Sequence, residues 1–343
     1  MKEVPRHQPD TGATLRREVV AAFEAGERFL LFTHVDPDLD CVGSGLALAE
    51  ALHSRGKQVW LWSPSPLPEQ YSFLPGPERV ATEYPAGVSF DVAVGLDTAA
   101  LDRVGKAPPF TRADFPVLVN IDHHESNTRF GTINWVDATA SSVGEMLYGL
   151  FEAWGVEVTR EMAVCLYASI VTDTGGFSFT NTTPRALRVA ASLVERGAEP
   201  FALWRHVFGS WPARRQALLG RALGTLRVWH DGRLATMRVT QTMLAEAGAV
   251  MEDTERFVQY ARSVRGVEVA AILREQPGGR SVRVGLRSNT PAMHVGRIAA
   301  GLGGGGHPNA AGCTVEGGLD EVEGTIVTLI GQALDVDATG GGA

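Results

Sequence analysis

The sequence predicts two α/β domains, the first built on a mainly parallel sheet and the second, smaller one on a mixed sheet. The length of 343 residues exceeds what one hydrophobic core usually holds, so we expect two domains. In the first part of the chain, short apolar runs alternate with helical patterns, as in βαβ units. Towards residue 200 this pattern ends, and a second, shorter α/β unit follows.

In the first domain, residues 1–200, the apolar runs are short and uninterrupted, which indicates strands buried on both faces of a parallel sheet. The expected order is a helix over 14–25, a strand over 28–32, a helix over 41–56, strands over 57–62, 90–97 and 115–122, and helices over 141–155, 160–175 and 183–198. A proline-rich passage over 63–85 separates the second strand from the third.

Residues 201–222 read as a helical connector, with Trp211-Pro212 as a break and with aromatic side chains that fit helix packing. The second domain spans residues 223–336. Its expected elements are strands over 233–240, 267–276 and 281–288, helices over 241–248 and 253–264, and, after a glycine-rich stretch, one more strand and a helix. Residues 337–343 are expected to form a disordered tail.

The composition is that of an ordinary soluble globular protein, with 44% hydrophobic and 20% charged residues. The three cysteines, Cys41, Cys165 and Cys313, form neither a disulfide framework nor a CxxC zinc pattern. The polar N-terminus does not resemble a signal peptide, and no apolar run has the length of a membrane span. We therefore expect a cytoplasmic protein without a membrane partner.

The net charge of −8 argues against a protein that coats long nucleic acids. The charge is unevenly distributed, because residues 201–300 carry +8, whereas residues 1–200 carry −10 and the last 43 residues carry −6. An acidic part beside a basic part suits a protein that binds cations in one place and an anion in another. The alternative is a simple clustering of surface arginines.

Residues of the kinds that bind metals follow the strands of the first domain. His34, Asp36, Asp38 and Asp40 follow the first strand, Asp97 the third, and Asp122, His123 and His124 the fourth, while Asp173 ends an apolar helix. Because ligands of a parallel sheet bind at the carboxyl ends of its strands, we expect these groups to meet along one edge. A single aspartate there is usually a cap or turn residue, but massed carboxylates repel each other unless cations neutralise them.

Aspartate oxygens with a few imidazoles favour Mn²⁺ or Mg²⁺ over structural zinc. The carboxylates suffice for two metals that share a bridging ligand, an arrangement suited to phosphoryl chemistry. In the pair His123-His124, successive side chains of an extended segment are expected to point to opposite sides. One histidine can then bind metal while the other protonates or polarises a leaving oxygen.

The ordered motifs HVDPDLDCVGS, LDTA, IDHH and VTDTGGF resemble those of the DHH phosphoesterases, and GLRS and GGGGHPNAAGC look like the DHHA1 domain that follows in one branch of that family. The resemblance runs from Arg28 to Gly318. It implies that His34 and Asp38 bind one metal, that Asp97 bridges, that Asp40, His123 and Asp173 bind the second metal, that His124 faces the substrate and that Asp122 supports the doublet.

Two positions depart from the family pattern, and neither removes a ligand. Leu39 stands where the family commonly has Gly, and Cys41 where a small residue such as Ala is usual. Asp36 is an additional carboxylate, for which we favour a turn-stabilising role over ligation.

The second domain is expected to hold the substrate. Glycines before His307 allow a backbone to approach a ligand, and their N–H groups can form an anion-binding nest. Arg287 lies in the basic block, and a guanidinium matches a phosphate bidentately. A flexible loop with a solvated histidine is the alternative. The residues expected to bind substrate are Arg103, Arg287, Ser288, Gly305, Gly306 and His307; His294 reads as a helix cap, and His53, His206 and His230 read as structural.

The branch that the sequence resembles most, the nanoRNase and pAp phosphatase group, implies a metal-dependent phosphoesterase acting on very short oligonucleotides and 3′-phosphoadenosine-5′-phosphate (pAp). The implied cofactor is two Mn²⁺ ions, with Mg²⁺ or Co²⁺ as substitutes; a metal-bound hydroxide would attack in line, in a cleft between the two domains. The alternatives are a RecJ-like single-strand exonuclease, a cyclic dinucleotide phosphodiesterase, an inorganic pyrophosphatase and, outside enzymes, a nucleotide-binding sensor. Substrate preference among short RNA, short DNA, pAp and cyclic dinucleotides, polarity and homodimer formation stay open.

Overall fold

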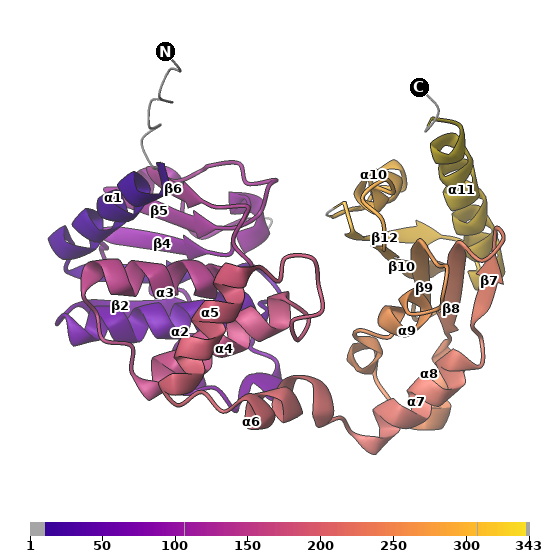
Figure 1. The fold of residues 1–343 in the computed structure, drawn as a ribbon, viewed down its shortest axis with the longest axis horizontal. Coiled ribbons are helices and arrows are strands. Elements are labelled where there is room, and N and C mark those ends of the chain that lie inside the picture. Colours follow the sequence, from indigo (N-terminus) through magenta and orange to yellow (C-terminus); the bar gives the residue numbers. More distant parts are fainter. Residues whose placement is uncertain (1–10, 106, 307, 341–343) are drawn as a thin grey trace, which may run out of the picture. The chain divides into compact units, whose positions relative to one another are not determined.

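The computed structural model describes residues 11–105, 107–306 and 308–340. The chain divides between Ser210 and Trp211 into two compact units, here called unit 1 and unit 2 (Figure 1). Each unit is an α/β fold around its own sheet, which confirms the fold class expected from the sequence. Within the described residues, no helix is both long enough and apolar enough to cross a membrane.

Unit 1 contains a parallel sheet with the strand order β3-β2-β1-β4-β5-β6. The strands are β1 (Arg28–Phe32), β2 (Gln58–Trp62), β3 (Val80–Ala81), β4 (Val92–Leu96), β5 (Val117–Asp122) and β6 (Ile133–Val136). From β1 the chain adds strands first on one side and then, starting with β4, on the other. In sheets of this kind, ligands bind at the carboxyl ends of the strands where the order reverses. The site is therefore expected between the ends of β1 and β4.

β1 illustrates why these residues form a central strand. Phe29 and Leu31 point into the core below the helices, whereas Leu30 and Phe32 point into a second core on the opposite face. All four side chains are fully buried. Burial on both faces is typical of a parallel strand and makes the end of β1 a fixed point from which polar residues can project.

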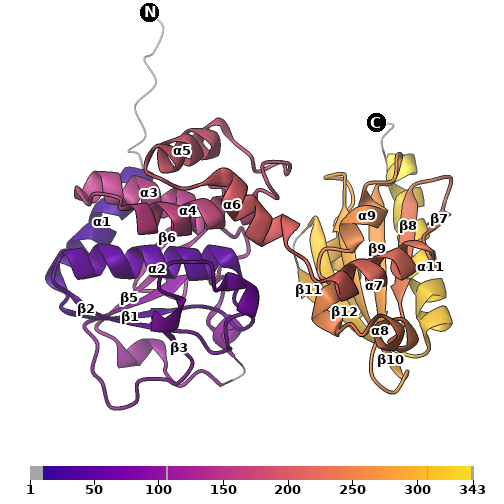
Figure 2. The same cartoon turned by 90° about the horizontal axis from the view of Figure 1, so that it is seen from below.

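The helices of unit 1 are α1 (Thr11–Ala25), α2 (Leu39–Ser54), α3 (Val143–Trp154), α4 (Arg160–Asp173), α5 (Pro184–Glu195) and α6 (Pro200–Trp204), followed by a π-helical turn at Arg205–Gly209. α2, α3 and α4 pack against one another on one side of the sheet (Figure 2). Each begins at a side-chain cap, namely Asp38, Ser142 and Thr159, which accept backbone N–H groups of the first turn. The cap at Asp38 starts α2 close to the exit of β1.

Unit 2 contains a mixed sheet in the order β11-β12-β10-β9-β8-β7, in which only β8 and β9 are parallel. Its strands are β7 (Arg227–Trp229), β8 (Leu234–Val239), β9 (Val269–Glu275), β10 (Ser281–Ser288), β11 (Gly305–Gly306) and β12 (Ala310–Glu316). One core involves α7 (Ala213–Leu223), α8 (Gln241–Ala247) and α9 (Val258–Arg262), and a second involves α10 (Val295–Gly301) and α11 (Leu319–Gly340).

The structure adds short elements to those expected from the sequence. β3, β6, β7 and β11 have two to four residues each, too few for a periodic signal. Short 3₁₀ turns lie at Glu69–Tyr71, Pro77–Arg79, Leu101–Val104, Arg112–Asp114 and Met251–Thr254. α11 extends to Gly340, so helix covers four residues of the segment 337–343 that we had expected to be a tail; residues 341–343 lie outside the described part.

Candidate metal centre

The carboxyl ends of three neighbouring strands carry the polar residues that the sequence analysis selected. His34 follows β1, Asp97 follows β4, and the pair His123-His124 follows β5. The first residues of α2 and the last residue of α4, Asp173, approach the same edge from the helical layer. The expectation that these separated motifs meet at one sheet edge is therefore met in the structure.

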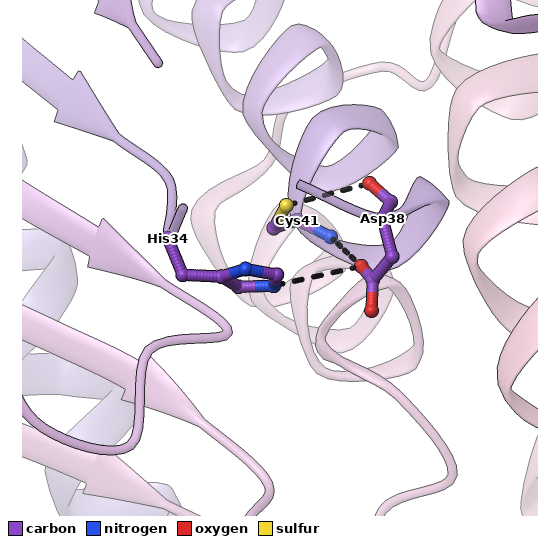
Figure 3. A group of neighbouring side chains, drawn as sticks. All are labelled: His34, Asp38 and Cys41. Carbon is purple, nitrogen blue, oxygen red and sulfur yellow. Dashed lines mark hydrogen bonds and ion pairs between the residues drawn. The ribbon is translucent and has the colours of Figure 1, made fainter. Parts of the chain in front are cut away.

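The first group of ligand atoms comes from His34, Asp38 and Cys41 (Figure 3). The Nε2 atom of His34 lies 3.9 Å from Oδ1 of Asp38, and the Nδ1 atom of His34 lies 2.9 Å from the carbonyl oxygen of Val35. That contact to a backbone carbonyl suits a histidine that offers Nε2 to a metal. His34 is buried, whereas Asp38 is exposed, so the group opens towards solvent at Asp38.

Asp97 lies at the centre of the site. Its Oδ2 is 3.6 Å from Nε2 of His34, and its Oδ1 is 3.4 Å from both Nε2 of His123 and Nδ1 of His124. The residue is 4% exposed, and Oδ1 has no hydrogen-bond partner among the described residues. Its φ of 53° is unusual for a residue other than glycine and is held by a bond from its N–H to the carbonyl of Ile121. A buried carboxylate oxygen without a hydrogen-bond donor is suited to bind a cation.

Two further groups share His123, and they are Asp40, His123 and Asp173, and Asp97, His123 and His124. Nε2 of His123 is 3.1 Å from Oδ2 of Asp173 and 3.6 Å from Oδ2 of Asp40. The other oxygen of Asp40 accepts hydrogen bonds from the hydroxyls of Ser44 and Ser169 and from the N–H of Gly144. The second oxygen, Oδ2, accepts from the N–H of Val143 at 2.8 Å and also faces His123, so Asp40 ties α2 to α3 and α4.

The two histidines of the doublet do not point to opposite sides, contrary to the alternation argument. Both imidazoles approach Oδ1 of Asp97, and their ring centroids are 4.8 Å apart. The reason is that β5 ends at Asp122, so the extended geometry no longer applies to the next two residues. The two rings differ instead in the atom presented, Nε2 in His123 and Nδ1 in His124.

Asp122 positions His123 and His124 through its two carboxylate oxygens. Its Oδ1 accepts from the N–H of His123 at 2.9 Å and lies 2.7 Å from Nδ1 of His124. Its Oδ2 accepts from the amide of Asn127, which also donates to Asn120. Asp122 is fully buried, so its position is determined by these partners. The arrangement fixes His124 with Nδ1 towards Asp122.

The charges of the site are strongly coupled. Burial would lower the pKa of His34, but the contacts with Asp97 and Asp38 raise it to about 9. Burial would raise the pKa of Asp97, yet the contacts with His123 and His34 hold it below its ordinary value. Burial, followed by the charges of Asp97 and Asp173, raises the pKa of Asp40 well above its ordinary value. Charged imidazoles and protons on carboxyl groups therefore offset the negative charge of this site. A divalent metal ion would supply the same positive charge, and the oxygen and nitrogen donors fit such an ion.

Two further predicted residues lie near this edge. Arg103 is exposed in the turn Leu101–Val104, and its carbonyl accepts from the N–H of Val35, next to His34. Asp36 belongs to none of the ligand groups found among the described residues. Asp36 has a φ of 54°, and its N–H donates to Ser65. These features agree with a turn position for Asp36.

In unit 2, Arg287 lies within a cluster of arginines. Burial, reinforced by the charges of Arg262 and Arg256, lowers the pKa of Arg287. Burial and the charges of Arg283 and Arg287 lower the pKa of Arg274 to about 10. Guanidinium groups that lower one another's pKa are favourable surroundings for an anion. The sequence analysis selected only Arg287; the net charge of residues 201–300 was the signal for the others.

The remaining predicted substrate residues differ in their surroundings. Ser288 is buried, and its hydroxyl donates to the carbonyl of Thr290 and accepts from the N–H of the same residue. Gly306 has a φ of 143° and approaches Ala310 and Ala311 so closely that a side chain would clash. A Cβ at Gly305 would meet nothing within 4 Å. The backbone thus requires a glycine at position 306, whereas position 305 has room for a side chain. His307 lies outside the described residues.

Some residues outside this site clarify other expectations. His294 caps α10, and its Nδ1 accepts from the N–H of Arg297, as the sequence predicted. The aromatic residues of 201–211, in contrast, are not all packed, because Phe201 is 73% and Trp204 52% exposed. α6 has five residues, and the residue that it buries is Leu203.

Comparisons with known proteins agree with the motif order. The family model described as "DHH family, N-terminal domain" matches residues 28–170, and that described as "DHHA1 domain" matches residues 232–334. The chain is 36% identical to the bifunctional oligoribonuclease and PAP phosphatase NrnA of Thermus thermophilus, over 92% of this chain and 93% of the relative. It is 26% identical to the protein of the same name from Bacillus subtilis, over 88% of this chain and 93% of the relative.

Among solved structures, an exopolyphosphatase-related protein from Bacteroides fragilis matches with a TM-score of 0.84 and 26% identity, covering 94% of this chain and 96% of that one. The fold, the two matching family models and the 36% identical relative lead to one conclusion. The chain belongs to the DHH/DHHA1 family of phosphoesterases.

Proposed function

We propose that this protein is a metal-dependent phosphoesterase that hydrolyses very short oligonucleotides and pAp. The observation that carries the proposal is Asp97, a buried carboxylate that lies within 3.6 Å of three imidazoles and connects the groups of ligand atoms. The substrate class is supported by the relatives of this chain, which are named bifunctional oligoribonuclease and PAP phosphatase.

We assign the ligands as follows. His34, Asp38 and Asp97 would hold one ion, and Asp97, Asp40, His123 and Asp173 would hold the other. Mn²⁺ is the proposed ion, because the set mixes carboxylate oxygens with imidazole nitrogens. When bound, two such ions supply the Lewis acidity that activates a water and stabilises the charge on the phosphate.

His124 would assist the departure of the leaving oxygen. Asp122 holds Nδ1 of His124 at 2.7 Å, and Asn127 holds Asp122 in turn. A carboxylate on one ring nitrogen stabilises the charged imidazole and orients the second nitrogen, Nε2, as the proton donor. Asp122 is therefore a positioning residue, and His124 is the proposed catalytic residue.

The arginines of unit 2 would bind a phosphate of the substrate. Arg287 and its neighbours Arg256, Arg262 and Arg274 form a cationic cluster. A cluster of this kind engages one or two phosphates, so extra nucleotides add little affinity; a long groove would engage more phosphates with each added nucleotide. This favours substrates of a few nucleotides.

A substrate panel tests the proposal. The metal-free protein is supplied with Mn²⁺ and given pAp, RNA of two to five nucleotides, a DNA 20-mer and cyclic di-AMP at equal concentrations. We expect the shortest RNAs and pAp to be hydrolysed fastest, and no hydrolysis when a chelator is present. Faster hydrolysis of the 20-mer than of a trinucleotide would instead support a tracking exonuclease.

A further inference from the structure

Cys41 lies at the wall of the first ligand group. One ligand atom each of Cys41, His34 and Asp38 lies within 4.8 Å of the others (Figure 3). The thiol donates to the carbonyl oxygen of Asp38 at 3.3 Å, and the N–H of Cys41 donates to Oδ1 of Asp38 at 3.1 Å. The side chain is fully buried. The sulfur is therefore held beside the two residues assigned to the first ion.

His34 also connects this group to a buried carboxylate. Asp97, which is 4% exposed, directs Oδ2 to within 3.6 Å of Nε2 of His34. Its Oδ1 has no hydrogen-bond partner among the described residues. His34 thus lies between the group with Asp38 and Cys41 on one side and Asp97 on the other.

The sulfur changes which ions suit this position. Oxygen ligands favour Mn²⁺ and Mg²⁺, whereas a thiolate favours Zn²⁺ and other soft cations. The other two cysteines are also buried, Cys165 in the core of α4 and Cys313 on β12 of unit 2, and neither belongs to a ligand group among the described residues. They serve as matched controls.

We propose that Cys41 makes the first metal position a mixed nitrogen, oxygen and sulfur site that binds thiophilic divalent cations, Zn²⁺ or Cd²⁺, through its thiolate. The inference rests on the proposed metal centre. Binding releases the thiol proton to solvent and forms the metal–sulfur bond, with no change of oxidation state. With Mn²⁺ the thiol keeps its hydrogen bond to Asp38; with a soft cation it becomes a ligand.

The test is a titration of the metal-free full chain with Cd²⁺, followed by the ultraviolet charge-transfer absorption of a cadmium–thiolate bond. We expect this band in the wild type, in Cys165→Ala and in Cys313→Ala, and its loss in Cys41→Ala and Cys41→Ser. The affinity for Cd²⁺ should fall about 10–100-fold or more in the Cys41 variants, since loss of an outer-shell partner alone costs that much. Mn²⁺ binding by the variants checks that the site still forms.

The possible failures are distinct. A wild type that binds Mn²⁺ and Cd²⁺ without the band, or a band that survives in Cys41→Ala, overturns the inference and leaves the proposed function standing. A wild type that binds neither ion overturns the metal centre itself, and the inference with it.

Discussion

The division of labour between His123 and His124 leads to a quantitative prediction. Nε2 of His123 faces Asp173, Asp97 and Asp40 at 3.1, 3.4 and 3.6 Å, so His123→Ala removes a nitrogen ligand and leaves three carboxylates without it. We expect the affinity for the second Mn²⁺ ion to fall about 10–100-fold or more. His124 instead contacts Asp122 through Nδ1 at 2.7 Å.

His124→Ala should therefore retain both ions and lose the proton donor. The expected loss in kcat is about 10²–10⁴-fold, the usual contribution of general acid–base catalysis. At about 1.4 kcal/mol for each factor of ten, this corresponds to roughly 3–5 kcal/mol of transition-state stabilisation. Asp122→Asn should lose part of the same factor, because the ring would no longer be oriented by a carboxylate.

The assay combines equilibrium Mn²⁺ binding with single-turnover hydrolysis of a diribonucleotide. His53→Ala is the matched control, because His53 is exposed near the end of α2 and lies outside the ligand groups. We expect it to match the wild type in both measurements. Equal loss of metal in His123→Ala and His124→Ala would refute the reasoning, as would a His124→Ala variant with unchanged kcat.

Further predictions concern the bridge, the cofactor, the substrate grip and the stability of unit 2. Asp97→Ala should abolish turnover and reduce the number of tightly bound Mn²⁺ ions, measured by equilibrium dialysis; full activity would exclude the bridging role. Chelation should remove all activity, and titration should restore it better with Mn²⁺ than with Mg²⁺, measured as the initial rate on pAp. Arg287→Ala should raise KM for pAp and dinucleotides with Mn²⁺ binding unchanged, whereas Arg221→Ala, which breaks an exposed ion pair with Glu246, should not; equal KM values would remove Arg287 from the site. Glu323→Gln should destabilise unit 2 by about 3 kcal/mol, because it breaks a buried ion pair with Arg238, measured by hydrogen exchange of the β8 amides. Burial would raise the pKa of Glu323, but the contacts with Arg238 and Thr236 hold this pKa below its ordinary value. The stabilisation is therefore present above the ordinary pKa and is lost as the pH falls through the lowered pKa. A difference in exchange rate that does not depend on pH would contradict this prediction.

The strands that position the site could be predicted because each of them is marked by its own run of apolar residues. β1, β4 and β5 are uninterrupted apolar runs, and polar residues follow each of them directly. Parallel strands bring their carboxyl ends to one edge, so His34, Asp97 and His123 were expected together once a parallel sheet was predicted. Ser169, which donates to Asp40, could also have been noticed, since it precedes Asp173 by one helical turn.

Other features depend on contacts that periodicity does not encode. β6 pairs only with β5 and has four residues, so its position is determined by its neighbour rather than by its own pattern. The directions of the His123 and His124 rings depend on where β5 ends. A strand that ended one residue earlier or later would turn each ring to another side. α2 begins at Leu39, two residues earlier than expected, because Asp38 caps it, and this places Cys41 in the first turn beside the ligands.

Residues that are distant in sequence were the hardest to group. Arg256, Arg262 and Arg274 were visible as part of a basic block, but only the packing of α9 against β9 and β10 places them near Arg287. The exposure of Phe201 and Trp204 likewise depends on what covers α6, which helical spacing does not reveal. Sequence patterns thus predict which residues belong to a functional site more readily than which residues contact one another.

The central claim, that two metal ions share Asp97, is tested most directly by electron paramagnetic resonance of the protein loaded with two equivalents of Mn²⁺. A shared carboxylate brings the ions to about 3.5–4 Å, the separation typical of two-metal phosphoesterase sites. The account predicts an exchange-coupled spectrum that reverts in Asp97→Ala to the signal of isolated Mn²⁺. A wild-type spectrum of isolated ions, or binding of a single ion, would contradict it.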